Sequence, residues 1–290
     1  MPKQSATKNL QAFSVHAHVE SGAVDYGLLF ARLANLQPNE RARVVGGRMV
    51  AIPHMSIKGD LVTLWAYEGD INTDPLFLNA QSMQERQGKL SPGDVLVQKT
   101  HAVIDAKSRT AVIELNGRGA KAADIADLLE QVARAELADD TLALDLNPRV
   151  CEDFVHEINR FGRIRVASLK LSRPNVSWTD HKDHMTDLAD ESRGHFIDVT
   201  VFAERKESID KNRGVVGFIK LLVREPLSIF RGAMVKGTRL GEKTETTITL
   251  ARFIEHRKVR VGRNAAGHVV DAEIEAEMLA YLKSLTSEES

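Results

Sequence analysis

The chain has 290 residues, a length that suits one large domain or two lobes and allows a buried core. Its formal net charge of −1 hides an uneven distribution, because residues 160–263 hold 22 Lys and Arg against 13 Asp and Glu. Cys151 is the one cysteine, which excludes an internal disulfide and indicates a reducing compartment. No apolar run approaches the ~18 residues of a membrane span, and residues 1–9 lack the apolar core of a signal peptide. We therefore expect a cytoplasmic protein without direct membrane insertion.

The first 140 residues predict an α+β lobe with a mostly antiparallel sheet. Residues 10–19 alternate apolar and polar side chains, which predicts a strand with one buried face that carries Phe13 and Val15. Helices are expected at 24–36, which Pro38 ends, and at 120–137, with a short helix within 75–88. Strands are expected at 42–52 and 61–67, and a hairpin joins 94–104 to 110–115.

Residues 141–290 predict a second, basic α+β lobe. We expect strands at 142–146, 163–171, 196–203 and 244–254, a short helix at 152–161 and a hairpin over 256–270. A terminal helix at 272–285 carries an apolar stripe. The fold class is therefore α+β with two lobes, 1–140 and 141–290, each a largely antiparallel sheet with flanking helices.

The stretch 204–243 interleaves cations with apolar runs and glycines, and the strand 163–171 directs further cations outward. A basic surface on a buried apolar scaffold is what a phosphate-backbone binder needs, although a charge run can also be an ordinary solvated face. Aromatic residues are only 5% of the chain, so platforms for stacking single strands are scarce and duplex DNA is favoured. The candidate nucleic-acid-binding residues are Arg163, Arg165, Lys170, Lys206, Lys211, Arg213, Lys220, Arg224 and Arg231.

No residue pattern marks a catalytic, metal or cofactor site. Glycines at 46–47 and 116–119 match neither phosphate-loop spacing, and turns explain them better. Cys151 lacks the surroundings of a nucleophile and is interpreted as a small buried hydrophobe. Two alternatives stay open: a protein–protein adaptor with a basic face, and a metal-dependent nuclease. The nuclease would use Asp198, Glu204 and Lys206, or the cluster that includes His181 and His184.

Several segments together resemble the RexA-like phage-exclusion proteins. They are the strand R-F-G-R-I-R-V-A-S-L-K-L at 160–171, the strand F-I-D-V-T-V at 196–201, the basic stretch that follows, and the ending H-R-K-V-R-V then G-H-V-V-D-A-E-I-E-A-E-M. The resemblance implies a two-lobed homodimer that binds double-stranded DNA without strong sequence preference. It further implies a non-enzymatic cytoplasmic sensor in antiphage defence that works with a separate membrane effector. The His- and Asp-rich segment 179–193 does not map onto the family.

Overall fold

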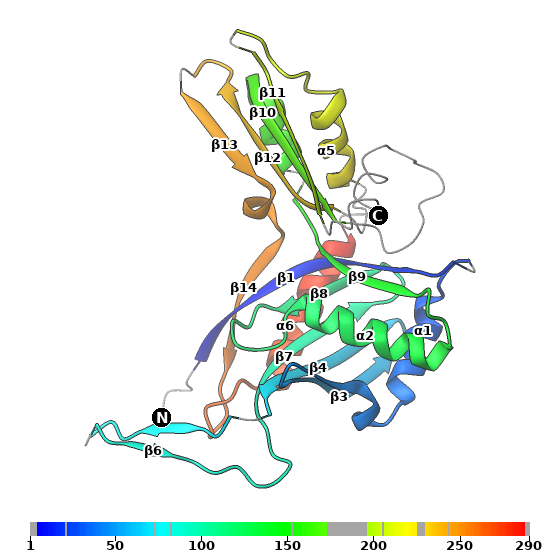
Figure 1. The fold of residues 1–290 in the computed structure, drawn as a ribbon, viewed down its shortest axis with the longest axis vertical. Coiled ribbons are helices and arrows are strands. Elements are labelled where there is room, and N and C mark those ends of the chain that lie inside the picture. The colour runs from blue at the N-terminus through cyan, green and yellow to red at the C-terminus, as the bar shows by residue number, and fades with distance from the viewer. Residues whose placement is uncertain are drawn as a thin grey trace. The chain divides into compact units, whose positions relative to one another are not determined.

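The chain folds into two units of antiparallel sheet and helix, which confirms the α+β class (Figure 1). The computed structural model describes residues 5–20, 22–71, 73–81, 83–151, 153–172, 196–204, 206–224, 230–242 and 244–287. The first unit combines Met1–Leu146 with His256–Ser290, and the second unit is Asn147–Glu255. In the described part of the chain, no helix is long and apolar enough to cross a membrane.

The first unit is built on a curled sheet in the order β14-β1-β8-β7-β4-β3-β2, with β9 paired to β1. Phe13 and Val15 of β1 join one apolar cluster, whereas Leu10 and Ala12 join another on the opposite face. The prediction of one buried face was therefore wrong, because helices cover both sides of this sheet. The strand bounds are β1 Ser5–His18, β2 Ala42–Val45, β3 Arg48–Lys58, β4 Leu61–Asp70, β7 Leu96–Asp105, β8 Thr110–Glu114, β9 Ala143–Pro148 and β14 His256–Gly262.

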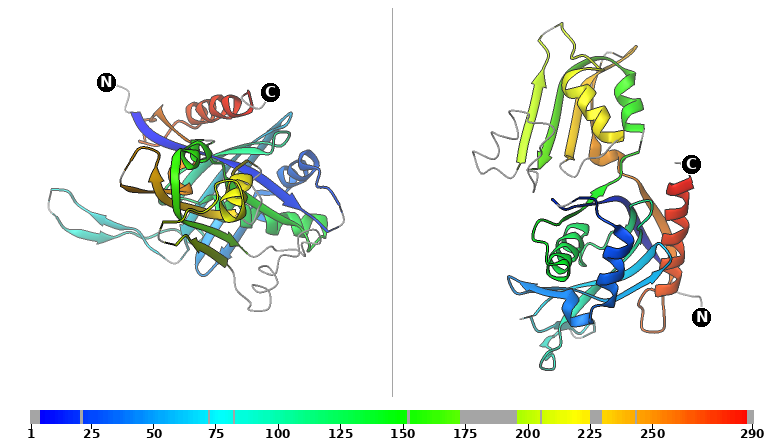
Figure 2. Two further views of the ribbon diagram at one scale, coloured as in Figure 1. Left: turned by 90° about the horizontal axis from the view of Figure 1, so that it is seen from above. Right: turned by 90° about the vertical axis from the view of Figure 1, so that its right-hand side faces the viewer.

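Helices α1 (Tyr26–Asn35) and α2 (Ala122–Leu137) pack on one face of this sheet, and α6 (Asp271–Ser287) packs on the other (Figure 2). Asp25 caps α1 by accepting a 3.0 Å hydrogen bond from the Leu28 backbone N–H. The 3₁₀ turn η1 (Pro38–Arg41) follows α1. The predicted helices at 24–36, 120–137 and 272–285 are confirmed. Each has an apolar stripe at helical spacing, and that stripe packs against the sheet.

The helix predicted within 75–88 is wrong. The structure has a hairpin there, of β5 (Leu76–Leu78) and β6 (Glu85–Gln87). It lies in the chain between the end of β4 and the start of β7 (Figure 1). The three consecutive apolar residues of β5 have no helical spacing, and cross-strand pairs hold them instead. The Arg86 guanidinium lies 4.7 Å from the centre of the Phe77 ring.

The second unit is a four-stranded antiparallel sheet in the order β11-β10-β12-β13. Its strands are β10 Phe161–Ser172, β11 Phe196–Phe202, β12 Phe230–Arg239 and β13 Glu245–Thr249, with the 3₁₀ turn η2 at Leu250–Phe253. Helices α3 (Asp153–Arg160) and α5 (Gly214–Arg224) bury their apolar stripes on one face of the sheet, against residues such as Ala167, Leu169 and Val235. The opposite face carries the alternate side chains.

The two units divide the chain differently from the predicted boundary at residue 140. The segment from His256 onward leaves the second unit and pairs with β1, in register from Ser5↔Gly262 to Gln11↔His256. Val259 and Val261 of β14 are buried in the α6 cluster. The terminal segment therefore completes the first unit, because its apolar residues fit that sheet and that helix.

Candidate nucleic-acid interface

The second unit has a sheet face that α3 and α5 leave uncovered, which we name the open face. The strand registers place alternate side chains of four neighbouring strands there, since side chains of a strand point to opposite faces in turn. In the described part of the chain, both helices of this unit pack on the other side. The open face carries Arg165, Val166, Ser168, Lys170, Asp198, Thr200, Phe202, Met234, Lys236, Thr238, Glu245, Thr247 and Thr249.

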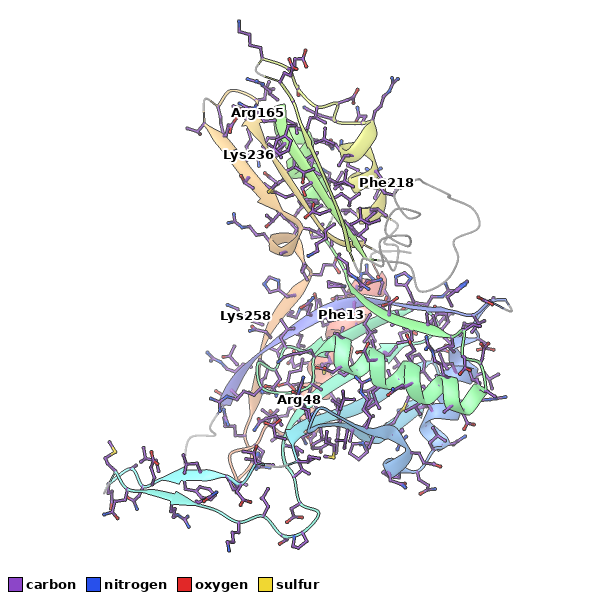
Figure 3. All side chains as sticks on the ribbon, viewed as in Figure 1. Phe13, Arg48, Arg165, Phe218, Lys236 and Lys258 are labelled. Carbon is purple, nitrogen blue, oxygen red and sulfur yellow. The ribbon has the colours of Figure 1, made fainter. Side chains whose placement is uncertain are left out.

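Two cations of the open face share one carboxylate. Arg165 Nη1 lies 3.5 Å from Glu245 Oε1, and Lys236 Nζ lies 3.2 Å from Glu245 Oε2. Figure 3 shows Arg165 and Lys236 close together at one end of the sheet. Their side chains are 40% and 43% exposed, so each pair contributes little to folding and exchanges readily with another anion. This corner of the face keeps a net positive charge.

A second group of predicted cations gathers beside α5. Lys220 Nζ donates to Asn159 Oδ1 at 2.6 Å and to Asn212 Oδ1 at 3.2 Å, and Lys211 Nζ donates to the Asn159 carbonyl at 3.3 Å. Burial lowers the pKa of Lys220, and the nearby charges of Lys211 and Arg224 lower it further. Three cations therefore lie near one another, with the Asp210 carboxylate as an opposing charge, and neutral amide groups accept the hydrogen bonds of both lysines.

Two of the predicted cations hold the unit together. Arg163 Nε donates to the Glu207 carbonyl at 2.9 Å, which fastens the loop after β11 to β10. Arg231 Nη1 donates to Asn147 Oδ1 at 2.9 Å, and Asn147 is itself buried. Lys206 and Arg213 are exposed in the loop between β11 and α5. The nine residues therefore do not share one surface.

The basic strand β14 belongs to the first unit. His256, Arg257, Lys258 and Arg260 are exposed along it, while Val259 and Val261 point into the core. The sequence predicted this strand as part of the basic C-terminal lobe 141–290. Its pairing with β1 instead places these cations at the edge of the other sheet.

The residues of the nuclease alternative are only partly brought together. Asp198 lies on the open face, where Ser168 Oγ donates to it at 2.8 Å, and Glu204 lies in the loop after β11. Among the described residues, no group of three or more His, Cys, Asp and Glu side chains is arranged to hold a metal ion. His181 and His184 fall outside the described residues.

Burial raises the pKa of the half-buried Cys151 thiol.

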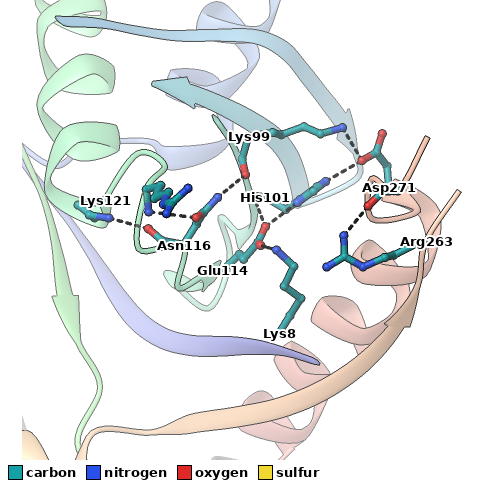
Figure 4. A network of polar contacts seen from close by, with 10 residues as sticks. Lys8, Lys99, His101, Glu114, Asn116, Lys121, Arg263 and Asp271 are labelled. Carbon is teal, nitrogen blue, oxygen red and sulfur yellow. Dashed lines mark hydrogen bonds and ion pairs between the residues drawn. The ribbon is translucent and has the colours of Figure 1, made fainter. Parts of the chain in front are cut away.

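Sequence reasoning missed a buried polar network in the first unit (Figure 4). His101 of β7 lies between two carboxylates, with Nδ1 2.7 Å from Glu114 Oε2 and Nε2 2.8 Å from Asp271 Oδ1. Lys8 Nζ donates to Glu114 Oε1, and Lys99 Nζ donates to Asp271 Oδ1, each at 2.5 Å. Asp271 is 170 positions from His101 in the chain, so no local sequence pattern predicts this network.

Burial would raise the pKa of Glu114, but hydrogen bonds from His101 and Lys8 outweigh burial, so the pKa is lowered. Burial likewise opposes ionisation of Asp271, and hydrogen bonds from Lys99 and His101 lower its pKa. Both carboxylates are therefore held ionised. Asp271 is the first residue of α6, so the network fastens the start of this helix to the sheet.

The chain matches no protein-family model, and no curated protein matches its sequence.

Proposed function

We propose that this protein binds double-stranded DNA without strong sequence preference and without catalysis, through cations of the second unit. The two lysines Lys211 and Lys220, which both donate to Asn159 beside α5, are the observation that carries the proposal. The shared carboxylate of Arg165 and Lys236 adds a second positive site on the same unit. Lys and Arg side chains that are not fully compensated by carboxylates can neutralise DNA phosphates.

The open face favours a duplex over single strands. In the described part of this face, Phe202 is the one aromatic side chain, and it is 71% exposed. Proteins that hold single strands generally offer several aromatic rings on which successive bases stack. A face rich in threonine and cations instead offers hydroxyl and ammonium donors, which suit the sugar-phosphate backbone.

The resemblance to RexA-like proteins supplies the biological setting of the proposal. In that setting the protein is a cytoplasmic, homodimeric sensor in phage exclusion, and a separate membrane protein is the effector. Sequence-independent binding suits such a role, because a sensor of this kind responds to the presence of DNA rather than to one operator.

Binding of a random duplex at two salt concentrations tests the proposal. We expect the affinity to fall steeply from 50 to 200 mM salt, because each phosphate contact releases a counterion. Single-stranded DNA and RNA of the same length are expected to bind more weakly. An affinity for the duplex that does not change with salt would remove the basis of the proposal, and absence of any nucleic-acid binding would favour an adaptor role.

A further inference from the structure

A cavity in the second unit lies where the end of α3 meets the start of β10 and the turn after β12. Its volume is about 240 Å³, and all of its lining residues belong to this unit. The charged residues of its wall are Arg160, Lys211, Arg239 and Glu242. Three cations therefore face one carboxylate across a space large enough for a small anion.

A neighbouring carboxylate orients the two arginines. Glu157 Oε1 lies 2.5 Å from Arg160 Nη1, and Glu157 Oε2 lies 2.6 Å from Arg239 Nη2. One carboxylate thus serves two guanidinium groups, each of which has five N–H donors. Glu242 Oε1 is 3.9 Å from Arg239 Nη1, which is beyond hydrogen-bond distance. Glu157 therefore brings the two guanidinium groups to the same site and leaves each with further N–H donors.

Lys211 closes the cavity with a third cation. Its Nζ has a 3.3 Å hydrogen bond to the Asn159 carbonyl, which is a long bond for an ammonium group. The last carbonyl of α3 has a different partner, because the Leu240 backbone N–H donates to Arg160 O at 3.0 Å. Because the partner of Lys211 is a neutral carbonyl at long distance, the Lys211 charge is available to a ligand.

We infer that this cavity binds a phosphate group, held by Lys211, Arg239 and Arg160. A phosphate oxyanion matches a cavity with two oriented guanidinium groups and one ammonium, since arginine donates two parallel hydrogen bonds to such an anion. The phosphate is either part of a DNA backbone or a free phosphate ion. The DNA form of the inference rests on the proposed function, and the free form does not.

Calorimetric titration of the full-length protein with inorganic phosphate, and separately with a random duplex, tests the inference. The test variant is Lys211→Gln, which removes one cation with a long hydrogen bond to Asn159 O and leaves the arginine pairs intact. The matched control is Lys58→Gln, which makes the same charge change at an exposed position of β3 in the first unit. We expect phosphate to bind the wild type and the control with equal affinity, and to bind Lys211→Gln about tenfold more weakly.

The inference is overturned if the wild type shows no saturable phosphate binding, or if Lys211→Gln binds phosphate as well as Lys58→Gln does. Duplex binding without phosphate binding would overturn the inference and leave the proposed function standing. Phosphate binding without duplex binding would support the cavity as a free-phosphate site and would refute the proposed function. Thermal unfolding of each variant checks that it is folded.

Discussion

Glu245 is the residue whose removal most directly tests the open face. In the variant Glu245→Gln, Arg165 and Lys236 lose their shared carboxylate, from which they lie 3.5 and 3.2 Å away. Each half-exposed pair contributes roughly 0.2–1 kcal/mol, so releasing both cations makes about 0.4–2 kcal/mol available to DNA binding. We therefore expect the duplex affinity to rise roughly 2- to 30-fold at low salt.

Fluorescence anisotropy with a labelled random duplex measures this change. The plot of log affinity against log salt should become steeper by about one unit, since the protein gains one net positive charge at the contact surface. The control is Glu136→Gln, which removes a carboxylate from an exposed position of α2 in the first unit. An unchanged affinity in Glu245→Gln, or an equal gain in both variants, would refute the assignment of DNA binding to the open face.

Two further variants test the structural roles assigned above. Arg231→Ala removes the hydrogen bond to the buried Asn147, so we expect the free energy of unfolding in urea to fall by about 1–3 kcal/mol. The salt slope of DNA binding should stay unchanged. A reduced slope would show that Arg231 contacts phosphate. Glu114→Gln breaks the buried pair with His101, so we expect a loss of about 3 kcal/mol at pH 7. Since the folded-state pKa of Glu114 is lowered, its stabilising effect is present above the unfolded pKa of about 4.3 and is lost as pH falls through the lower folded value. The stability gap between wild type and Glu114→Gln should therefore narrow below about pH 4.3, and a gap that is constant from pH 7 to pH 3 would contradict this reasoning.

Local periodicity predicted the helices and most strands, because the face that an element buries determines the spacing of its apolar residues. Ile125, Leu128 and Leu129 recur at helical spacing in α2. The short polar link between 94–104 and 110–115 predicts the hairpin that the structure contains. The hairpin of β5 and β6 was missed because its strands have three residues each, too few for alternation to be visible. Short strands are defined by their partners rather than by their own pattern.

The candidate site could be predicted only as a set of residue types. The sequence shows that Arg163 and Arg165 point away from the buried positions of one strand, but the structure gives them different partners, a backbone carbonyl and Glu245. A register shift between Ile164 and Val166 in the pairing of β10 with β12 separates these neighbours. His101 was missed for a related reason, since its partners come from β8 and α6, far apart in the chain.

The return of the chain from the second unit to the first determines the order in which the units can be completed during translation. The two ends of the second unit meet, since the Glu255 backbone N–H donates to Arg149 O at 2.9 Å and Val150 bridges Ile254. All of this unit has been synthesised before β14 and α6 exist. Although residues 5–146 are synthesised before the second unit, the first unit lacks an edge strand and one helical layer until β14 and α6 emerge. We therefore expect the inserted unit to be the first of the two to reach its native structure on the ribosome, against the usual N-terminal-first order.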